Sequence, residues 1–195
     1  LNDLSFLVMD LEFRGRADLA QVLVDGYQRA FHDPTASRVL LHEVMEAQGD
    51  VAEKLKVAEG SRVFCLKRLR LADDHPMGVQ AAYVPLDLAP DLPAQNFENA
   101  SLYEFLKNRY GLVPVRAREI HVAVALDPAD AALLKVPEGS PALAAERVTY
   151  LESGRPMELV HSLMRGDRYE IMLDLVHSPS QRERPSGGLG CRKLP

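Results

Sequence analysis

Two arginines on a predicted strand are the residues of this sequence best suited to chemistry. In the apolar run 62–71, alternation with a period of two places Arg68 and Arg70 on the same face of the strand. A buried guanidinium without a partner is costly, so both side chains need carboxylates or an anion. Two interpretations are open. Either they pair with acids of neighbouring strands, such as Glu158, or they line a cleft and hold a phosphate or carboxylate, whose oxygens match the guanidinium fork.

A helix N-terminus offers a second possible anion site. Ser101 precedes the predicted helix 102–109, and Glu104 completes a capping-box pattern with it. The serine hydroxyl and the first N–H groups of such a helix can hold an anion, although capping alone also explains a serine at this position.

A polar turn is predicted where the last strand ends. It contains Arg168 and Tyr169 within the segment 165–169. Loops of this kind carry binding residues more often than strands do, so the turn could close a pocket. A plain surface turn is the alternative interpretation.

The sequence holds no motif for a bound cofactor, a metal or an activated nucleophile. The patterns GxGxxG, GxxxxGK[ST] and GxSxG are all missing. The six histidines lack HxxxH or HxH spacing, and Cys65 and Cys191 are too far apart for a CxxC site. We therefore expect no cofactor, no metal and no disulfide framework, and a reducing, cytoplasmic setting.

Composition excludes several classes of protein. The 195 residues include 23 Lys and Arg against 28 Asp and Glu, for a net charge of −5, which is atypical of a free-standing nucleic-acid binder. No apolar run approaches the roughly 20 residues of a membrane span, so no contact with membrane is expected. The composition is that of one folded domain with a single core.

An internal repeat organises the elements that must position these residues. The segment 55–61, LKVAEGS, recurs as LKVPEGS at 134–140. Such self-similarity exposes the unit from which a fold is built. Two further correspondences follow at the same offset: Arg68 with Arg147, and Arg70 with Thr149. Halves that share a scaffold and differ at polar positions indicate one asymmetric pocket on a symmetric frame.

Each half is predicted to be a short helix followed by a β-hairpin. A further helix and strand lie between the halves, and another strand starts near Ser37. A mainly antiparallel central sheet with flanking helices, an α+β fold, buries these faces most simply. The predicted helices are 50–56, 102–109 and 128–135, and the predicted strands are 62–71, 79–84, 119–126, 142–151 and 159–164.

In combination these segments resemble a known family. The motifs that carry the resemblance, within roughly Ser37 to Leu175, are SRVL at 37–40, RLR at 68–70, PM at 76–77, YVP at 83–85, SLYE at 101–104, PME at 156–158 and DRY at 167–169. They resemble the UTRA domain, the effector-binding half of HutC-type regulators in the GntR family of bacterial transcription factors.

The resemblance implies a chorismate-lyase-like fold that senses a small molecule. By this resemblance Ser37, Arg68, Arg70 and Ser101 would bind the anionic group of an effector, such as a phosphate or a carboxylate. Glu158 and Tyr169 would face the rest of the ligand, and Gln80, Tyr83 and Arg168, which lie in or beside the matching motifs, complete the expected ligand-binding set. Many members have Glu where this chain has Gln80, and a neutral amide cannot pair with an ammonium group as a carboxylate does.

The resemblance also implies a domain organisation and partners. Residues 1–36 would be a helical lead-in, 37–177 the ligand-binding domain and 178–195 a flexible tail. A homodimer is expected. The chain starts at Leu1 with no winged helix before it, so we expect DNA to be bound only through a winged-helix domain upstream of this segment. Two other functions stay open: an enzyme of the chorismate-lyase type, which shares the expected fold, and a module that serves only for dimerisation.

Overall fold

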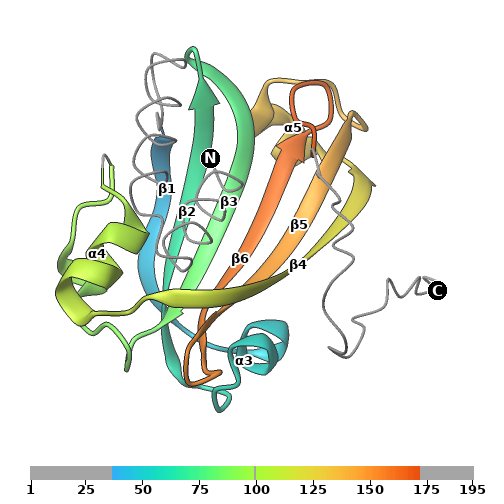
Figure 1. Cartoon of the computed structure of the whole chain (residues 1–195). Coiled ribbons are helices and arrows are strands. Elements are labelled where there is room, and N and C mark those ends of the chain that lie inside the picture. Colours follow the sequence, from blue (N-terminus) through green and yellow to red (C-terminus); the bar gives the residue numbers. More distant parts are fainter. Residues whose placement is uncertain (1–36, 99, 172–195) are drawn as a thin grey trace, which may run out of the picture.

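The computed structural model describes residues 37–98 and 100–171, and the predicted lead-in 1–36 and tail 178–195 lie outside the described residues (Figure 1). The described elements follow one another along the chain as strands, short helices and one 3-10 turn, η1. Their bounds are β1 Ser37–Glu46, α3 Gly49–Leu55, β2 Arg62–Ala72, β3 His75–Pro85, η1 Leu92–Ala94, α4 Leu102–Tyr110, β4 Pro114–Ala125, α5 Pro128–Leu134, β5 Pro141–Leu151 and β6 Pro156–Arg165.

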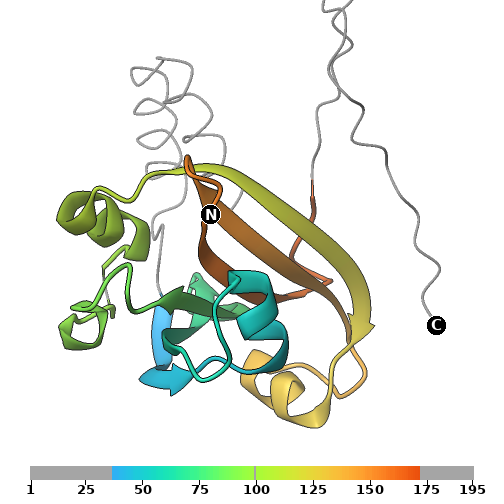
Figure 2. The same ribbon diagram turned by 90° about the horizontal axis from the view of Figure 1, so that it is seen from below.

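The strands form one six-stranded sheet in the order β1-β2-β3-β6-β5-β4, and every neighbouring pair is antiparallel. Helix α4 covers one face of the sheet, and α3 and α5 lie on the other (Figures 1 and 2). The predicted α+β fold with an antiparallel central sheet and flanking helices is therefore confirmed.

The internal repeat corresponds to two structurally equivalent halves, β1-α3-β2-β3 and β4-α5-β5-β6. Helices α3 and α5 both end at a lysine in the left-handed conformation, Lys56 at φ 53° and Lys135 at φ 56°. The turns that follow make matching hydrogen bonds: Gly60 N–H donates to the carbonyl of Ala47, and Gly139 N–H donates to the carbonyl of Leu126. The two halves meet along β3 and β6 at the centre of the sheet.

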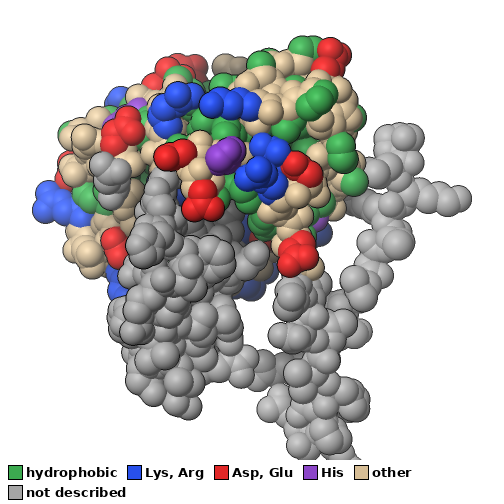
Figure 3. Space-filling model, turned by 90° about the horizontal axis from the view of Figure 1, so that it is seen from above, with side chains coloured by type: hydrophobic (Ala, Val, Ile, Leu, Met, Phe, Trp, Pro, Cys, Tyr) green, Lys and Arg blue, Asp and Glu red, His purple; other side chains and the backbone are tan. Residues whose placement is uncertain are grey.

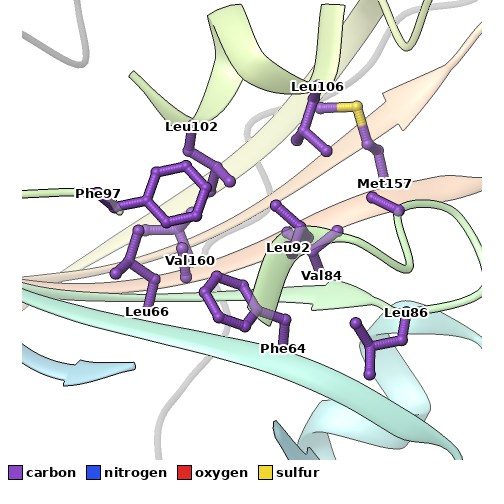
Figure 4. Packing of buried hydrophobic residues seen from close by; sticks show 12 residues of the cluster. Phe64, Leu66, Val84, Leu86, Leu92, Phe97, Leu102, Leu106, Met157 and Val160 are labelled. Carbon is purple, nitrogen blue, oxygen red and sulfur yellow. The ribbon is translucent and has the colours of Figure 1, made fainter. Parts of the chain in front are cut away.

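The core has a layer on each side of the sheet. Under α4, Phe64 and Phe97 pack with their ring centroids 5.8 Å apart, and Leu102 and Leu106 of the helix cover them (Figure 4). On the other side, one cluster lies under α3 and another under α5. A helix of nine residues is held mainly by such packing, because so short a helix is marginal in water by itself.

Gly78 is required where the two halves meet. A Cβ at this position would lie 2.3 Å from Sδ of Met164 and 2.8 Å from the carbonyl oxygen of Leu163. The sulfur can move aside but the strand backbone cannot, so we expect Gly78→Ala to lower the free energy of unfolding by about 1–3 kcal/mol. Urea unfolding measures this loss. Gly154→Ala is the matched control, because its Cβ meets open space and only its φ of +79° is unfavourable. A smaller loss for Gly78→Ala than for the control would contradict the steric account.

Among the residues that the structure describes, no helix is both long and apolar enough to cross a membrane.

Candidate functional site

Buried polar side chains gather on the face of the sheet that α4 partly covers. In the described part of the chain, all the buried polar and charged side chains except Arg165 lie on this face. The strand register places them in adjacent rows: Arg68 lies opposite Gln80, Gln80 opposite Ser162, and Thr149 opposite Glu158. Burial of a polar group costs free energy unless the group has a hydrogen-bond partner or a ligand. A sheet face that buries so many polar groups is therefore a candidate binding site.

Arg70 and Gln80 form the first part of the site. Nε and Nη2 of Arg70 donate to Oε1 of Gln80, at 3.2 and 2.7 Å. Nε2 of Gln80 in turn donates to Oγ of Ser162 at 3.4 Å, which fixes the orientation of the amide. Because an amide is neutral, Gln80 orients the Arg70 guanidinium without cancelling its positive charge.

Glu158 and Tyr103 form the second part. Glu158 is 1% exposed, and its Oε2 accepts a hydrogen bond from the hydroxyl of Tyr103 on α4. The same hydroxyl lies 3.3 Å from Oγ1 of Thr149. Burial raises the pKa of Glu158, and the positive charges of the nearby arginines act against that rise. This polar link joins α4 to the sheet beside the arginines.

Positive charge exceeds negative charge in the buried part of the site. We call Arg68, Arg70 and Arg147 the arginine cluster; Arg68 is 9% exposed and Arg147 4%. Burial, together with repulsion from Arg68 and Arg147, lowers the pKa of Arg70 to about 9, so Arg70 remains protonated at neutral pH. Among the described residues Glu158 is the one buried acid. The half-buried Glu119 of β4 lies opposite Arg147 at the margin of the site. An anion bound here would relieve the mutual repulsion of the cluster.

The structure brings together part of the predicted set of site residues. Arg68, Arg70, Gln80 and Glu158 share one face of β2, β3 and β6. Ser37 lies opposite Arg70 in the β1–β2 register, at the edge of the same face. The first of the two interpretations of the arginines, a direct ion pair between strands, does not describe Arg70, whose side-chain partner is the amide of Gln80.

The other predicted residues lie elsewhere or have another role in the structure. Tyr83 lies on the opposite face, where its ring centroid is 5.7 Å from that of His161. Oγ of Ser101 accepts the N–H of Glu104 at 3.3 Å, so it caps α4. Arg168 is exposed and Tyr169 is half-buried in the turn after β6.

Sequence reasoning missed Tyr103, Thr149 and Ser162 as parts of the site. The internal repeat could have indicated Thr149 as a site residue, since Thr149 occupies in the second half the position of Arg70 in the first. Tyr103 sits within the SLYE motif, but only the docking of α4 brings its hydroxyl to Glu158.

One cluster on the opposite face has ligand types that suit a metal. The potential ligand atoms of Asp50, Glu146 and His161 lie within 4.8 Å of one another. The ammonium of Lys54 forms ion pairs with both Glu146 and Asp50, the latter at 3.8 Å. The chain's own Lys54 ammonium therefore occupies this cluster and balances part of its negative charge.

Comparisons with known proteins identify the kind of protein that this fold and site define. The model of the UTRA domain matches residues 32–170. The HTH-type transcriptional repressor NagR of Bacillus subtilis is 31% identical over 137 residues, which cover 70% of this chain and 56% of NagR. The mannosyl-D-glycerate transport/metabolism system repressor MngR of Escherichia coli is 30% identical over 142 residues, 73% of this chain and 59% of MngR.

A solved structure agrees with these relatives. The ligand-binding domain of a putative GntR-family transcriptional regulator from Bordetella bronchiseptica is similar with a TM-score of 0.65 and 28% identity, over 73% of this chain and 89% of that one. The chain is therefore a ligand-binding effector domain, and it belongs to the UTRA domain family, as the motifs predicted. It spans less than two thirds of the length of the two curated repressors. These relatives are regulators, and the alternative of a chorismate-lyase-type enzyme is not favoured.

Proposed function

We propose that this chain is the effector-sensing part of a bacterial transcription regulator and that its effector is a small anionic metabolite held by the arginine cluster. The observation that carries the proposal is the presence of three buried or half-buried arginines around a single buried carboxylate. A phosphate or carboxylate would supply the missing negative charge and accept charge-assisted hydrogen bonds.

The neutral groups around the cluster suggest the rest of the ligand. Hydroxyls of Ser162, Thr149 and Tyr103 and the amide of Gln80 can each donate or accept a hydrogen bond. This set suits a polyhydroxylated carbon skeleton, as in a sugar phosphate or a hydroxy acid. Gln80 in place of a carboxylate disfavours a ligand with an ammonium group next to it.

Attraction of the ligand must be local. The chain has a net charge of −5, and the surface in Figure 3 shows acidic and basic side chains beside one another among apolar ones. Such a surface does not steer an anion from a distance, so binding would depend on the arginine cluster itself.

The regulatory role is inferred from the relatives, which are named as repressors. Effector binding would change the operator affinity of a winged-helix domain in the same cytoplasmic, homodimeric protein, because a ligand that prefers one arrangement of the domains shifts the population towards it.

Isothermal titration calorimetry with a compound panel tests this function. The panel should contain sugar phosphates, the matching unphosphorylated sugars, hydroxy acids and inorganic phosphate, all in a buffer without phosphate or sulfate. We expect saturable binding of at least one anionic member and none of its uncharged counterpart. Equal binding of a sugar with and without its phosphate would reject the anionic assignment.

A further inference from the structure

We propose that binding of the anionic effector is coupled to protonation of Glu158, so that the site takes up a proton together with its ligand. This inference rests on the proposed function, because it requires an anion at the arginine cluster. It adds a dependence on pH to that function, since the effector binds more tightly as the pH falls.

Glu158 is buried among positive charges. Among the described residues, the charged and titratable groups that act on its carboxyl are Arg68 and Arg70 of β2, Arg147 of β5 and Tyr103 of α4. Removal from water favours the protonated carboxylic acid, whereas the guanidiniums and the tyrosine hydroxyl favour the ionised carboxylate. Burial has the larger effect and raises the pKa of Glu158. Because the two influences oppose each other, added negative charge at the cluster shifts the balance towards the acid.

The hydrogen bonds around Glu158 accommodate both of its protonation states. The hydroxyl of Tyr103 is bonded to Oε2 of Glu158 and lies 3.3 Å from Oγ1 of Thr149, where either oxygen can be the donor. When Glu158 is ionised, Tyr103 donates to the carboxylate and Thr149 can donate to Tyr103. When Glu158 is protonated, its O–H can donate to Tyr103, and Tyr103 then donates to Thr149. Rotation of two hydroxyl groups therefore accommodates the proton, and each side chain keeps its place.

Tyr103 does not supply the proton. Burial raises the pKa of its hydroxyl, and the negative charge of Glu158 acts in the same direction. The tyrosine therefore stays a neutral hydroxyl at physiological pH. The proton that Glu158 takes up comes from the solvent, and the carboxyl O–H is the one covalent bond that forms.

The sign of the coupling follows from the charges. An anion held by Arg68 and Arg70 places negative charge near Glu158 and offsets the guanidiniums that favour its ionised form. Both effects raise the pKa of Glu158 in the complex above its value in the free protein. Binding is then linked to proton uptake, so the affinity for the anion falls as the pH rises from the lower of these two pKa values to the higher. The fall is at most about tenfold per pH unit, because one group takes up one proton.

Calorimetry with inorganic sulfate tests the coupling. Sulfate stays a dianion between about pH 5.5 and 7.5, whereas a phosphate ester loses its second proton near a pKa of about 6. Arg70, with a pKa of about 9, remains protonated in this range. Titrations of the full chain in buffers with different heats of ionisation give the number of protons taken up. We expect about 0.3–1 proton per sulfate, and a dissociation constant that rises about two- to tenfold per pH unit.

Two variants assign the proton to its residue. Glu158→Gln keeps the size of the side chain but has no charge. It should bind sulfate without proton uptake and, at the upper end of the pH range, about two- to tenfold more tightly than the unmodified chain. His42→Gln is the matched control, because His42 lies on the same face, beside Phe64 and Phe97, and an imidazole changes its charge in this pH range. This variant should retain the proton uptake.

The outcomes separate this inference from the proposed function. Sulfate binding that depends neither on pH nor on the buffer would overturn the coupling and leave the anion site in place. The unmodified chain alone decides this point, even if Glu158→Gln does not fold. Proton uptake that persists in Glu158→Gln, or is lost in His42→Gln, would also overturn the assignment to Glu158. Absence of anion binding at every pH would overturn the proposed function, and the coupling with it.

Discussion

Replacing Arg70 by alanine is expected to weaken binding of the anionic effector by about 10- to 100-fold, because a charge-assisted hydrogen bond contributes about 1.5–3 kcal/mol. Arg70→Lys should retain part of the affinity, since an ammonium keeps the charge but not the fork. Calorimetry with the tightest-binding phosphate compound, or with inorganic phosphate, measures the change. Arg109→Ala is the control, because this exposed arginine pairs with Asp91 on the surface. An unchanged dissociation constant for Arg70→Ala would contradict the site.

The stability of the same variant separates a binding role from a structural one. Without ligand, Arg70 is repelled by Arg68 and Arg147, and this repulsion contributes to its lowered pKa. Removing its charge should therefore leave the melting temperature unchanged or raise it in a phosphate-free buffer. If Arg70 instead stabilised the fold through a buried ion pair, its replacement by alanine would lower the free energy of unfolding by about 3–5 kcal/mol, as is typical when one partner of such a pair is removed.

Replacing Glu158 by alanine is expected to cause the largest loss of stability among these variants, about 3–5 kcal/mol. The substitution leaves the arginine cluster without its buried counter-charge and leaves the hydroxyl of Tyr103 without its carboxylate acceptor. Urea unfolding gives the free energy. The exposed turn residue Glu152 is the control, and Glu152→Ala should change stability by no more than about 0.5 kcal/mol.

Added anion should restore part of the stability of Glu158→Ala. A bound phosphate supplies negative charge to the cluster, and any ligand that binds only the folded state raises its stability. The stabilisation by phosphate should exceed that of the unmodified protein at the same concentration. Equal stabilisation of both proteins, or a loss below 0.5 kcal/mol for the variant, would show that Glu158 does not balance the arginines.

Much of the fold could be predicted from local patterns. The repeat of 55–61 at 134–140 predicted two helix-and-hairpin halves, and both turns form the same hydrogen bonds. The predicted starts of the strands were less accurate. β3 begins at His75 and not at Val79, because Asp73 and Asp74 both have positive φ and close the hairpin in two residues. Nothing in the composition of that segment distinguished so tight a turn from a longer one.

The site was predictable only where it follows strand periodicity. Arg68 and Arg70 share a face because β2 has no irregularity before Arg70, and Gln80 joins them through the hairpin register. The same periodicity argues against Tyr83 as a ligand-binding residue, because Tyr83 is three residues from Gln80 and so points to the other face of the sheet. The Tyr103–Glu158 contact joins a helix to a distant strand, and such a contact depends on tertiary packing that the sequence pattern does not specify.

A crystal structure of the chain with its tightest-binding phosphate compound tests the central claim most directly. We predict the phosphate on the α4 face of the sheet, with oxygens within hydrogen-bond distance of the guanidiniums of Arg68 and Arg70 and with the sugar towards Thr149 and Ser162. A phosphate bound at another place, with the arginine cluster unchanged from its ligand-free arrangement, would contradict the account.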